Sequence, residues 1–132
     1  MTVSVRYIVN NVDAALPFYI EMLGFSVEMH PAPDFASLSR GDLRLLLNQP
    51  GAGGAGRSMD DGRQPAPGGW NRIQLEVDDI EATVNKLKSA GAGFRNEIVT
   101  GNGGKQVLIE DPSGNAIELF QPFEAGKGGR VR

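Results

Sequence analysis

Apolar and polar residues alternate along several short stretches of this chain, and a period of two is typical of half-buried β-strands. Residues 2–9 show this alternation first, with valine and tyrosine on one side. A helical spacing follows and ends at Gly24. The helix is predicted to start near Asp13, because Pro17 then falls in the first turn, where a missing N–H is tolerated. The apolar stripe of this helix is predicted to be Leu16, Tyr19, Ile20 and Leu23. Three more strands are predicted at residues 25–30, 35–39 and 43–48.

The same order of strand, helix and three strands returns after residue 69. Residues 70–77 alternate, and residues 79–90 have a helical period that Gly91 ends. The predicted stripe of this second helix is Ile80, Val84, Leu87 and Ala90. The remaining strands are predicted at residues 95–100, 105–110 and 116–121, with turns at Asn102-Gly103 and at residues 111–114. A repeated order of elements is the sequence sign of a tandem duplication.

The two halves are joined by residues 49–69, which are rich in Gly, Pro and Ala and have no apolar period. This stretch is longer than the usual loop of a compact domain, so it is predicted to be a flexible linker, with a functional lid as the alternative. The modules are then residues 1–48 and 70–123, followed by a loose tail at residues 124–132. Because each half is too small to close a core alone, the modules are expected to form one structural domain.

Composition and charge narrow the function classes. The 132 residues carry 13 Lys+Arg against 16 Asp+Glu, and this acidic balance argues against a nucleic-acid partner. No apolar run is long enough to span a membrane, and no export signal is visible, so a cytoplasmic location is expected. The absence of cysteine excludes disulfides and thiolate metal sites. The one histidine, His30, is predicted to be a solvated strand-end residue on the side of Ser26 and Glu28.

Three segments match the motifs of a known family. DPSGNAIELFQP at residues 111–122 matches a closing turn and strand, FYIEMLGF at residues 18–25 matches a first helix, and LEVDDIEATVNKLKSAGA at residues 75–92 matches a strand-to-helix entry. In this order the chain resembles the vicinal oxygen chelate superfamily of glyoxalase I, bleomycin-resistance proteins and extradiol dioxygenases. The resemblance implies an α+β fold: two tandem βαβββ modules form a curved mixed sheet that encloses a cleft, with the helices outside, often in a homodimer.

Catalytic members of that superfamily hold a divalent metal on four side chains. Carried over by position, these fall on Ser4, on Arg72, on Glu118 and at or beside Leu45, within residues 43–48, which contain no Asp, Glu or His. Only Glu118 is a metal-ligand type that matches. A guanidinium is permanently charged and has no lone pair to offer, so Arg72 would repel a metal. No cofactor is therefore expected, with a divalent metal as the less favoured alternative.

The resemblance points six polar side chains of the opening and closing strands toward the cleft: Ser4, Arg6, Arg72, Gln74, Glu76 and Glu118. One interpretation is that Arg72 and Glu118 form an ion pair that fills the vacated metal position. The other is that Arg72 and Gln74 donate hydrogen bonds to an anionic or carbonyl-bearing ligand, while Glu118 orients the arginine. If the protein is an enzyme, Glu118 is the candidate base.

Two aromatic residues have alternative roles. Trp70, at the start of the second module, is expected to cap the edge of the core, and the alternative is a stacking platform for an aromatic ligand. Phe35 is expected to lie in the core, with the same alternative.

Together these observations favour a metal-free protein that binds a small organic molecule in the cleft, as a homodimer, over an enzyme. The predicted ligand-binding residues are Ser4, Arg6, Trp70, Arg72, Gln74 and Glu118. One alternative is a lyase-, isomerase- or dioxygenase-type enzyme with an atypical site. The other is a non-catalytic interaction module whose cleft is filled by its own Leu45, Leu47 and Ile8. A fold alone does not choose among these functions.

Overall fold

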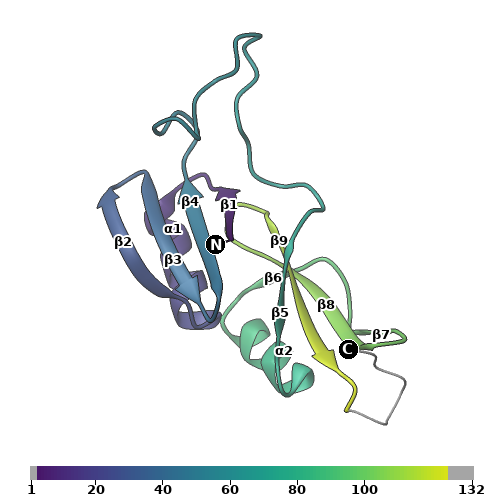
Figure 1. Ribbon diagram of the computed structural model, residues 1–132. Coiled ribbons are helices and arrows are strands. Elements are labelled where there is room, and N and C mark those ends of the chain that lie inside the picture. Colours follow the sequence, from purple (N-terminus) through teal and green to yellow (C-terminus); the bar gives the residue numbers. More distant parts are fainter. Residues whose placement is uncertain (1–2, 125–132) are drawn as a thin grey trace. The chain divides into compact units, whose positions relative to one another are not determined.

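A computed structural model describes residues 3–124 of the chain (Figure 1). The predicted tail, apart from Glu124, lies outside the described residues. The chain divides into two compact units by its internal contacts. Within the described residues, the first unit contains residues 3–69 and the turn at 111–115, and the second contains residues 70–110 and 116–124.

The first unit is a four-stranded mixed sheet with a helical segment. In sheet order β1-β4-β3-β2, the first strand runs parallel to its neighbour and the other pairs are antiparallel. Figure 1 shows β2, β3 and β4 side by side, with α1 behind them. The elements are β1 (Ser4–Ile8), α1 (Val12–Pro17), the π-helix η1 (Phe18–Met22), β2 (Ser26–Ala32), β3 (Phe35–Arg40) and β4 (Leu43–Asn48).

The helical segment begins close to the predicted Asp13, but Pro17 is the last residue of α1 and not, as predicted, part of its first turn. The Asn11 side chain accepts a hydrogen bond from the Ala14 N–H at 2.8 Å and caps α1. After Pro17, which has no N–H to donate, the chain continues as the π-helix η1. Leu16 and Ile20 of the predicted stripe are only half-buried. The buried residues are Val12, Ala15, Phe18, Tyr19 and Leu23.

The core of the first unit lies against the face of β4 that carries Leu45 and Leu47. Both side chains are fully buried, so these two of the three residues named for a self-filled cleft belong to the core. The open face of β4 carries Arg44 and Leu46 instead. Successive side chains of a strand point to opposite faces, so an error of one residue in the alignment moves the assignment from one face to the other.

The second unit repeats this topology, which confirms the α+β class and the two βαβββ modules. Its sheet order is β5-β9-β8-β6, β5 is parallel to β9, and β7 also pairs with β8. The elements are β5 (Ile73–Glu76), α2 (Ile80–Ser89), β6 (Gly93–Phe94), β7 (Val99–Thr100), β8 (Gly104–Glu110) and β9 (Ala116–Pro122). Asp79 caps α2, and Gly91 ends it with a φ of 87°. Of the predicted stripe, only the C-cap residue Ala90 is exposed.

The strand predicted at residues 95–100 is interrupted. The Arg95 N–H donates to the Leu108 carbonyl at 2.9 Å, as in a ladder. The Leu108 N–H, however, donates to the side-chain Oδ1 of Asn96 at 2.9 Å. An asparagine side chain that replaces a backbone acceptor competes with the sheet. The result is two short strands, β6 and β7, instead of one.

The connection at residues 49–69 contains no helix or strand, but its first part is folded. The Gly51 N–H donates to the Gly56 carbonyl at 2.6 Å, and the Gly56 N–H donates to the Ala52 carbonyl at 2.9 Å. A Cβ on Gly56 would lie 2.4 Å from the Gln49 carbonyl oxygen, so only glycine fits this turn. Residues 49–56 are therefore a compact turn of the first unit.

The predicted turn at residues 111–114 forms, and it belongs to the first unit. The Gly114 N–H donates to the Asp111 carbonyl at 3.0 Å, and Gly114 has a φ of 87°. The buried carboxylate of Asp111 accepts a hydrogen bond from the Tyr19 hydroxyl at 2.7 Å. Burial, and then the charge of Asp111, raise the pKa of Tyr19 far above its ordinary value.

This raised pKa predicts a loss of stability in alkaline solution. Above about pH 10 the unfolded tyrosine loses its proton while the folded one keeps it, so the free energy of unfolding falls by about 1.4 kcal/mol per pH unit. Tyr19→Phe removes this contribution and leaves the other tyrosine, Tyr7, in place. Urea unfolding of both proteins, from neutral pH to about pH 11, is expected to show the steeper fall in the wild type. Parallel slopes would contradict the buried tyrosine–carboxylate contact.

Candidate ligand-binding site

Three of the predicted site residues meet on one face of the second sheet. Gln74 of β5 lies directly beside Glu118 of β9 in the parallel register. Oε1 of Glu118 accepts hydrogen bonds from Nε and Nη2 of Arg72, at 3.1 and 2.9 Å. Its Oε2 accepts one from Nε2 of Gln74 at 2.6 Å. Both carboxylate oxygens are thus held by N–H donors of neighbouring side chains.

The burial of this cluster makes the pairing necessary. The Glu118 side chain is 10% exposed and the Arg72 side chain is 30% exposed. A carboxylate so far from water costs several kcal/mol unless a partner compensates its charge. Nη1 of Arg72 also donates to the Trp70 carbonyl at 3.2 Å, which ties the guanidinium to the chain before β5. The cluster is therefore a rigid ion pair with an amide support.

The donor set does not fit a divalent metal. Arg72 has no lone pair to offer, and Glu118 already accepts three hydrogen bonds, two of them from this cation. In the first unit, Arg6 pairs with Leu46 as Gln74 pairs with Glu118, so the position equivalent to Glu118 is Leu46, directly beside Leu45. Residues 3–124 contain no group of three or more His, Asp or Glu side chains that could hold a metal ion.

Trp70 was expected to cap the edge of the core, but it is 68% exposed and does not. The guanidinium carbon of Arg95 lies 4.6 Å from the Trp70 ring centroid, a cation–π geometry. Nε of Arg95 donates to Oε2 of Glu110 at 2.8 Å and is thereby oriented. The sequence shows no signal for this contact, since Arg95 belongs to a loop that follows a two-residue strand. One side of the indole is thus stacked on a cation.

The predicted residues of the first unit lie on its open sheet face. Ser4 lines a pocket there, and Nη1 of Arg6 donates to Oδ1 of Asn48. Phe35 is half-buried and lines the same pocket, so its expected place in the core is wrong. The reason is that the buried face of β3 is occupied by Ala36 and Leu38.

His30 is exposed, but its predicted neighbourhood is wrong. Its Nε2 lies 3.6 Å from Oδ1 of Asp13 on α1, whereas Glu28 and Met29 both line the pocket. The pairing of β2 with β3 shifts register on each side of Met29. Such an irregularity breaks the alternation of faces along the strand. His30 therefore does not share the face of Glu28.

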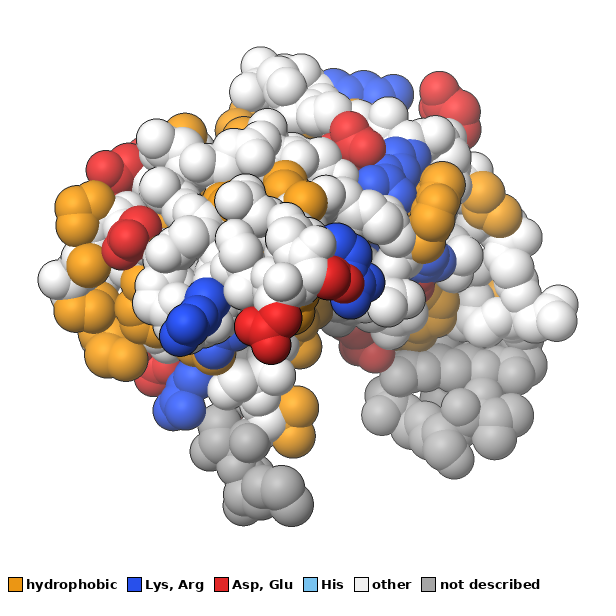
Figure 2. Space-filling model, turned by 90° about the horizontal axis from the view of Figure 1, so that it is seen from above, with side chains coloured by type: hydrophobic (Ala, Val, Ile, Leu, Met, Phe, Trp, Pro, Cys, Tyr) orange, Lys and Arg blue, Asp and Glu red, His pale blue; other side chains and the backbone are white. Residues whose placement is uncertain are grey.

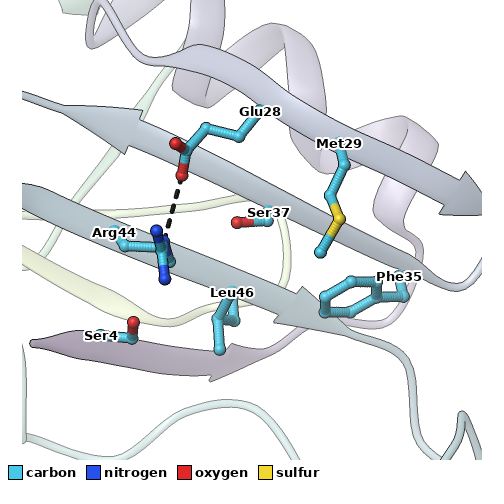
Figure 3. A pocket seen from close by; sticks show the side chains of 7 residues that line it. All are labelled: Ser4, Glu28, Met29, Phe35, Ser37, Arg44 and Leu46. Atoms are coloured by element: carbon cyan, nitrogen blue, oxygen red, sulfur yellow. Dashed lines mark hydrogen bonds and ion pairs between the residues drawn. The ribbon is translucent and has the colours of Figure 1, made fainter. Parts of the chain in front are cut away.

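The pocket of the first unit has a volume of about 400 Å³ (Figure 3). Reasoning from the sequence missed most of it, because two of its residues sit at the irregular part of β2. The lining residues are Ser4, Glu28, Met29, Phe35, Ser37, Arg44 and Leu46. Nε of Arg44 donates to Oε1 of Glu28 at 3.2 Å. The pocket thus combines an ion pair with apolar side chains.

Two further observations concern the charge of the surface and the length of the helices. On the face seen in Figure 2, Lys and Arg side chains are interspersed with Asp and Glu and form no basic stripe. Among residues 3–124, no helix is long and apolar enough to cross a membrane.

Comparisons with known proteins place this geometry in a family. The sequence model of the Glyoxalase/Bleomycin resistance protein/Dioxygenase superfamily matches residues 3–119. A protein of Vibrio parahaemolyticus (serotype O3:K6) named "Probable lactoylglutathione lyase" is 36% identical over 61 residues, which are 45% of this chain and 44% of that protein.

Two solved structures share the fold. A superfamily member from Sphaerobacter thermophilus has 26% identity and a TM-score of 0.72, with 92% of this chain and 96% of that one covered. TnmS3, an antibiotic-binding protein from Streptomyces sp. CB03234, has 23% identity and a TM-score of 0.70, with 93% and 96% covered. With the family match spanning nearly all of the described residues, this chain belongs to the glyoxalase/bleomycin resistance protein/dioxygenase superfamily.

Proposed function

We propose that this chain binds a small organic molecule, without a metal ion, on the open face of its second sheet. The observation that carries the proposal is the engagement of both Glu118 oxygens by Arg72 and Gln74. The carboxylate that would hold a metal in a catalytic relative serves here to orient a guanidinium. An oriented guanidinium is a preformed site for an anionic or carbonyl oxygen.

The arginine keeps hydrogen-bonding capacity for such a ligand. A guanidinium has five N–H groups. Two of these N–H groups donate to Glu118 and one donates to the Trp70 carbonyl. The other two N–H groups have no partner within residues 3–124. The exposed Trp70 ring belongs to the same segment and has Arg95 stacked on one side. The favoured ligand is therefore an aromatic compound that carries a carboxylate or carbonyl group.

The superfamily relatives support two functions. The name of TnmS3 associates this fold with antibiotic binding, which agrees with the proposal. The Vibrio relative's name favours the alternative, a lyase-type enzyme, with Glu118 as the base. Oε1 of Glu118 accepts two hydrogen bonds from a permanent cation and Oε2 accepts one from Gln74, so only one of the four lone-pair positions is left to accept a substrate proton. Binding is therefore preferred over catalysis, and the homodimer and the cytoplasmic location stay predictions.

The ligand proposal is tested by tryptophan fluorescence. Trp70 is the only tryptophan in the sequence, so its emission reports on this site alone. Aromatic carboxylates and their neutral amides, titrated into the protein, are expected to quench Trp70 and raise the melting temperature. Arg72→Met should weaken the binding of carboxylates by about tenfold, the effect of one charge-assisted hydrogen bond. If no compound of either series quenches Trp70, the proposal fails.

The metal-free part has its own test. The purified protein is incubated with Zn²⁺, Ni²⁺, Fe²⁺ or Mn²⁺, desalted and measured by elemental analysis. The metal content is expected to stay well below one ion per chain, both in the wild type and in Glu118→Ala. Stoichiometric metal in the wild type that is lost in Glu118→Ala would overturn the proposal and favour the enzyme.

A further inference from the structure

The pocket of the first unit has a polar end and an apolar end. Figure 3 shows Glu28 and Arg44 paired at one end and Met29 and Phe35 at the other, with the Ser37 side chain between them. Ser37 is buried, although it lines the pocket. The volume of about 400 Å³ lies in the range of small-molecule sites. All of these residues belong to the first unit, and none of them belongs to the Arg72–Glu118 cluster.

The ion pair at the polar end is only partly satisfied. Its single hydrogen bond joins Nε of Arg44 to Oε1 of Glu28. Oε2 of Glu28 and both Nη atoms of Arg44 make no other hydrogen bond or ion pair in the part of the chain that the structure describes. The two side chains are 41% and 44% exposed, so a ligand can reach them. The pair thus offers one acceptor oxygen and a two-nitrogen fork side by side.

This pairing selects the charge of a ligand. A lone carboxylate that approaches the Arg44 fork also meets the repulsion of Glu28, and a lone ammonium that approaches Glu28 meets Arg44. A ligand that carries both groups on neighbouring atoms satisfies both at once, with its carboxylate on the fork and its ammonium on the free Glu28 oxygen. The apolar end then takes an aromatic or aliphatic side chain, against Phe35 and Met29.

We propose that this pocket binds a zwitterionic amino acid with an apolar side chain. The inference goes beyond the proposed function, because it concerns another unit of the molecule and an independent set of residues. The ammonium lies on Glu28, the carboxylate on Arg44, and the side chain fills the apolar end beside Leu46.

Four probes test the zwitterion by isothermal titration calorimetry. They are L-phenylalanine, 3-phenylpropionate, which lacks the amine, phenethylamine, which lacks the carboxylate, and N-acetylphenylalanine, whose nitrogen is uncharged. L-Phenylalanine is expected to bind about tenfold more tightly than each of the other three, the value of one charge-assisted hydrogen bond. Equal binding of 3-phenylpropionate and L-phenylalanine, or no binding of L-phenylalanine at millimolar concentration, would overturn the proposal.

Variants that remove one charge of the pair distinguish this pocket from a general apolar site. Glu28→Gln removes the repulsion toward anions, so 3-phenylpropionate is expected to gain affinity relative to L-phenylalanine. Arg44→Gln should favour phenethylamine in the same way. Both side chains are well exposed, so neither change should unfold the sheet, which circular dichroism checks.

A matched control variant and the Arg72→Met variant distinguish the proposed amino-acid pocket from the proposed site at Arg72. Asp61→Asn breaks an exposed arginine–carboxylate pair elsewhere in the first unit and is expected to change none of the four affinities. Arg72→Met, which tests the other site, is expected to leave L-phenylalanine binding unchanged. An affinity for L-phenylalanine that falls in Arg72→Met but not in Arg44→Gln would contradict this pocket while leaving the proposed function standing.

Discussion

Asp111→Asn is expected to lower the free energy of unfolding by about 3 kcal/mol, although the two side chains have the same shape. Oδ1 of Asp111 accepts hydrogen bonds from the N–H groups of Ser113 and Asn115, at 2.8 and 2.9 Å. Oδ2 accepts from the Tyr19 hydroxyl and from Nδ2 of Asn115, at 2.7 and 3.0 Å. An asparagine has only one acceptor oxygen, so its amide must face at least one of these donors.

The loss is large because the site is buried and joins distant segments. The Nδ2 group of Asn115 also donates to the Ile8 carbonyl at 2.7 Å, and its Oδ1 accepts from the Gly68 N–H at 2.8 Å. A misplaced amide at position 111 therefore disturbs the contact of the turn with β1, η1 and the end of the connection. A buried donor without an acceptor costs about 1 to 3 kcal/mol.

Urea unfolding monitored by circular dichroism measures this effect, with Asp60→Asn as the control. Asp60 is exposed and makes no hydrogen bond or ion pair with another described residue, so its replacement should change stability by less than about 0.5 kcal/mol. Equal stabilities of Asp111→Asn and Asp60→Asn would show that the turn does not hold the first unit together.

Glu118→Gln is the second large effect, with an expected loss of about 2 kcal/mol. The neutral amide leaves the Arg72 guanidinium without a counter-charge and places an N–H group against Arg72 or Gln74. Because Arg72 is 30% exposed, water can hydrate it, and the loss stays below that of a fully buried pair. Thermal and urea unfolding give the value.

A double-mutant cycle at positions 72 and 118 measures the contribution of the ion pair to stability. Arg72→Met combined with Glu118→Leu removes both charges, and it is expected to be more stable than Glu118→Leu alone. Asp61→Asn, in the exposed pair with Arg63, should cost less than about 0.5 kcal/mol. A double variant less stable than the sum of its single variants would contradict an unfavourable unpaired Arg72 and point to packing instead.

Local patterns in the sequence were sufficient for the repeated βαβββ order. Gly91 ends its helix and the turn at residues 111–114 forms as predicted, and the helices are capped by Asn11 and Asp79, residue types that favour this position. These features depend on neighbours a few positions away, so the chain shows them without its fold. The mismatch of Arg72 with a metal site is likewise a property of the residue itself.

The face of each strand was harder to predict. An alternating strand gives two faces but does not say which one is buried when both carry leucine, as β4 does with Leu45, Leu46 and Leu47. In β2, the register shift at Met29 changes the alternation itself. The pocket therefore could not be predicted from the sequence, because its residues share a face only after these strands have paired.

The α+β repeat could be predicted from the chain alone, because it follows from residue type and short-range spacing. Three contacts became visible only in the folded protein: Asp111 with Tyr19, Trp70 with Arg95, and Glu28 with Arg44 at the pocket. Contacts between residues far apart in the chain depend on how sheets and loops bring them together, and local periodicity carries no information about that.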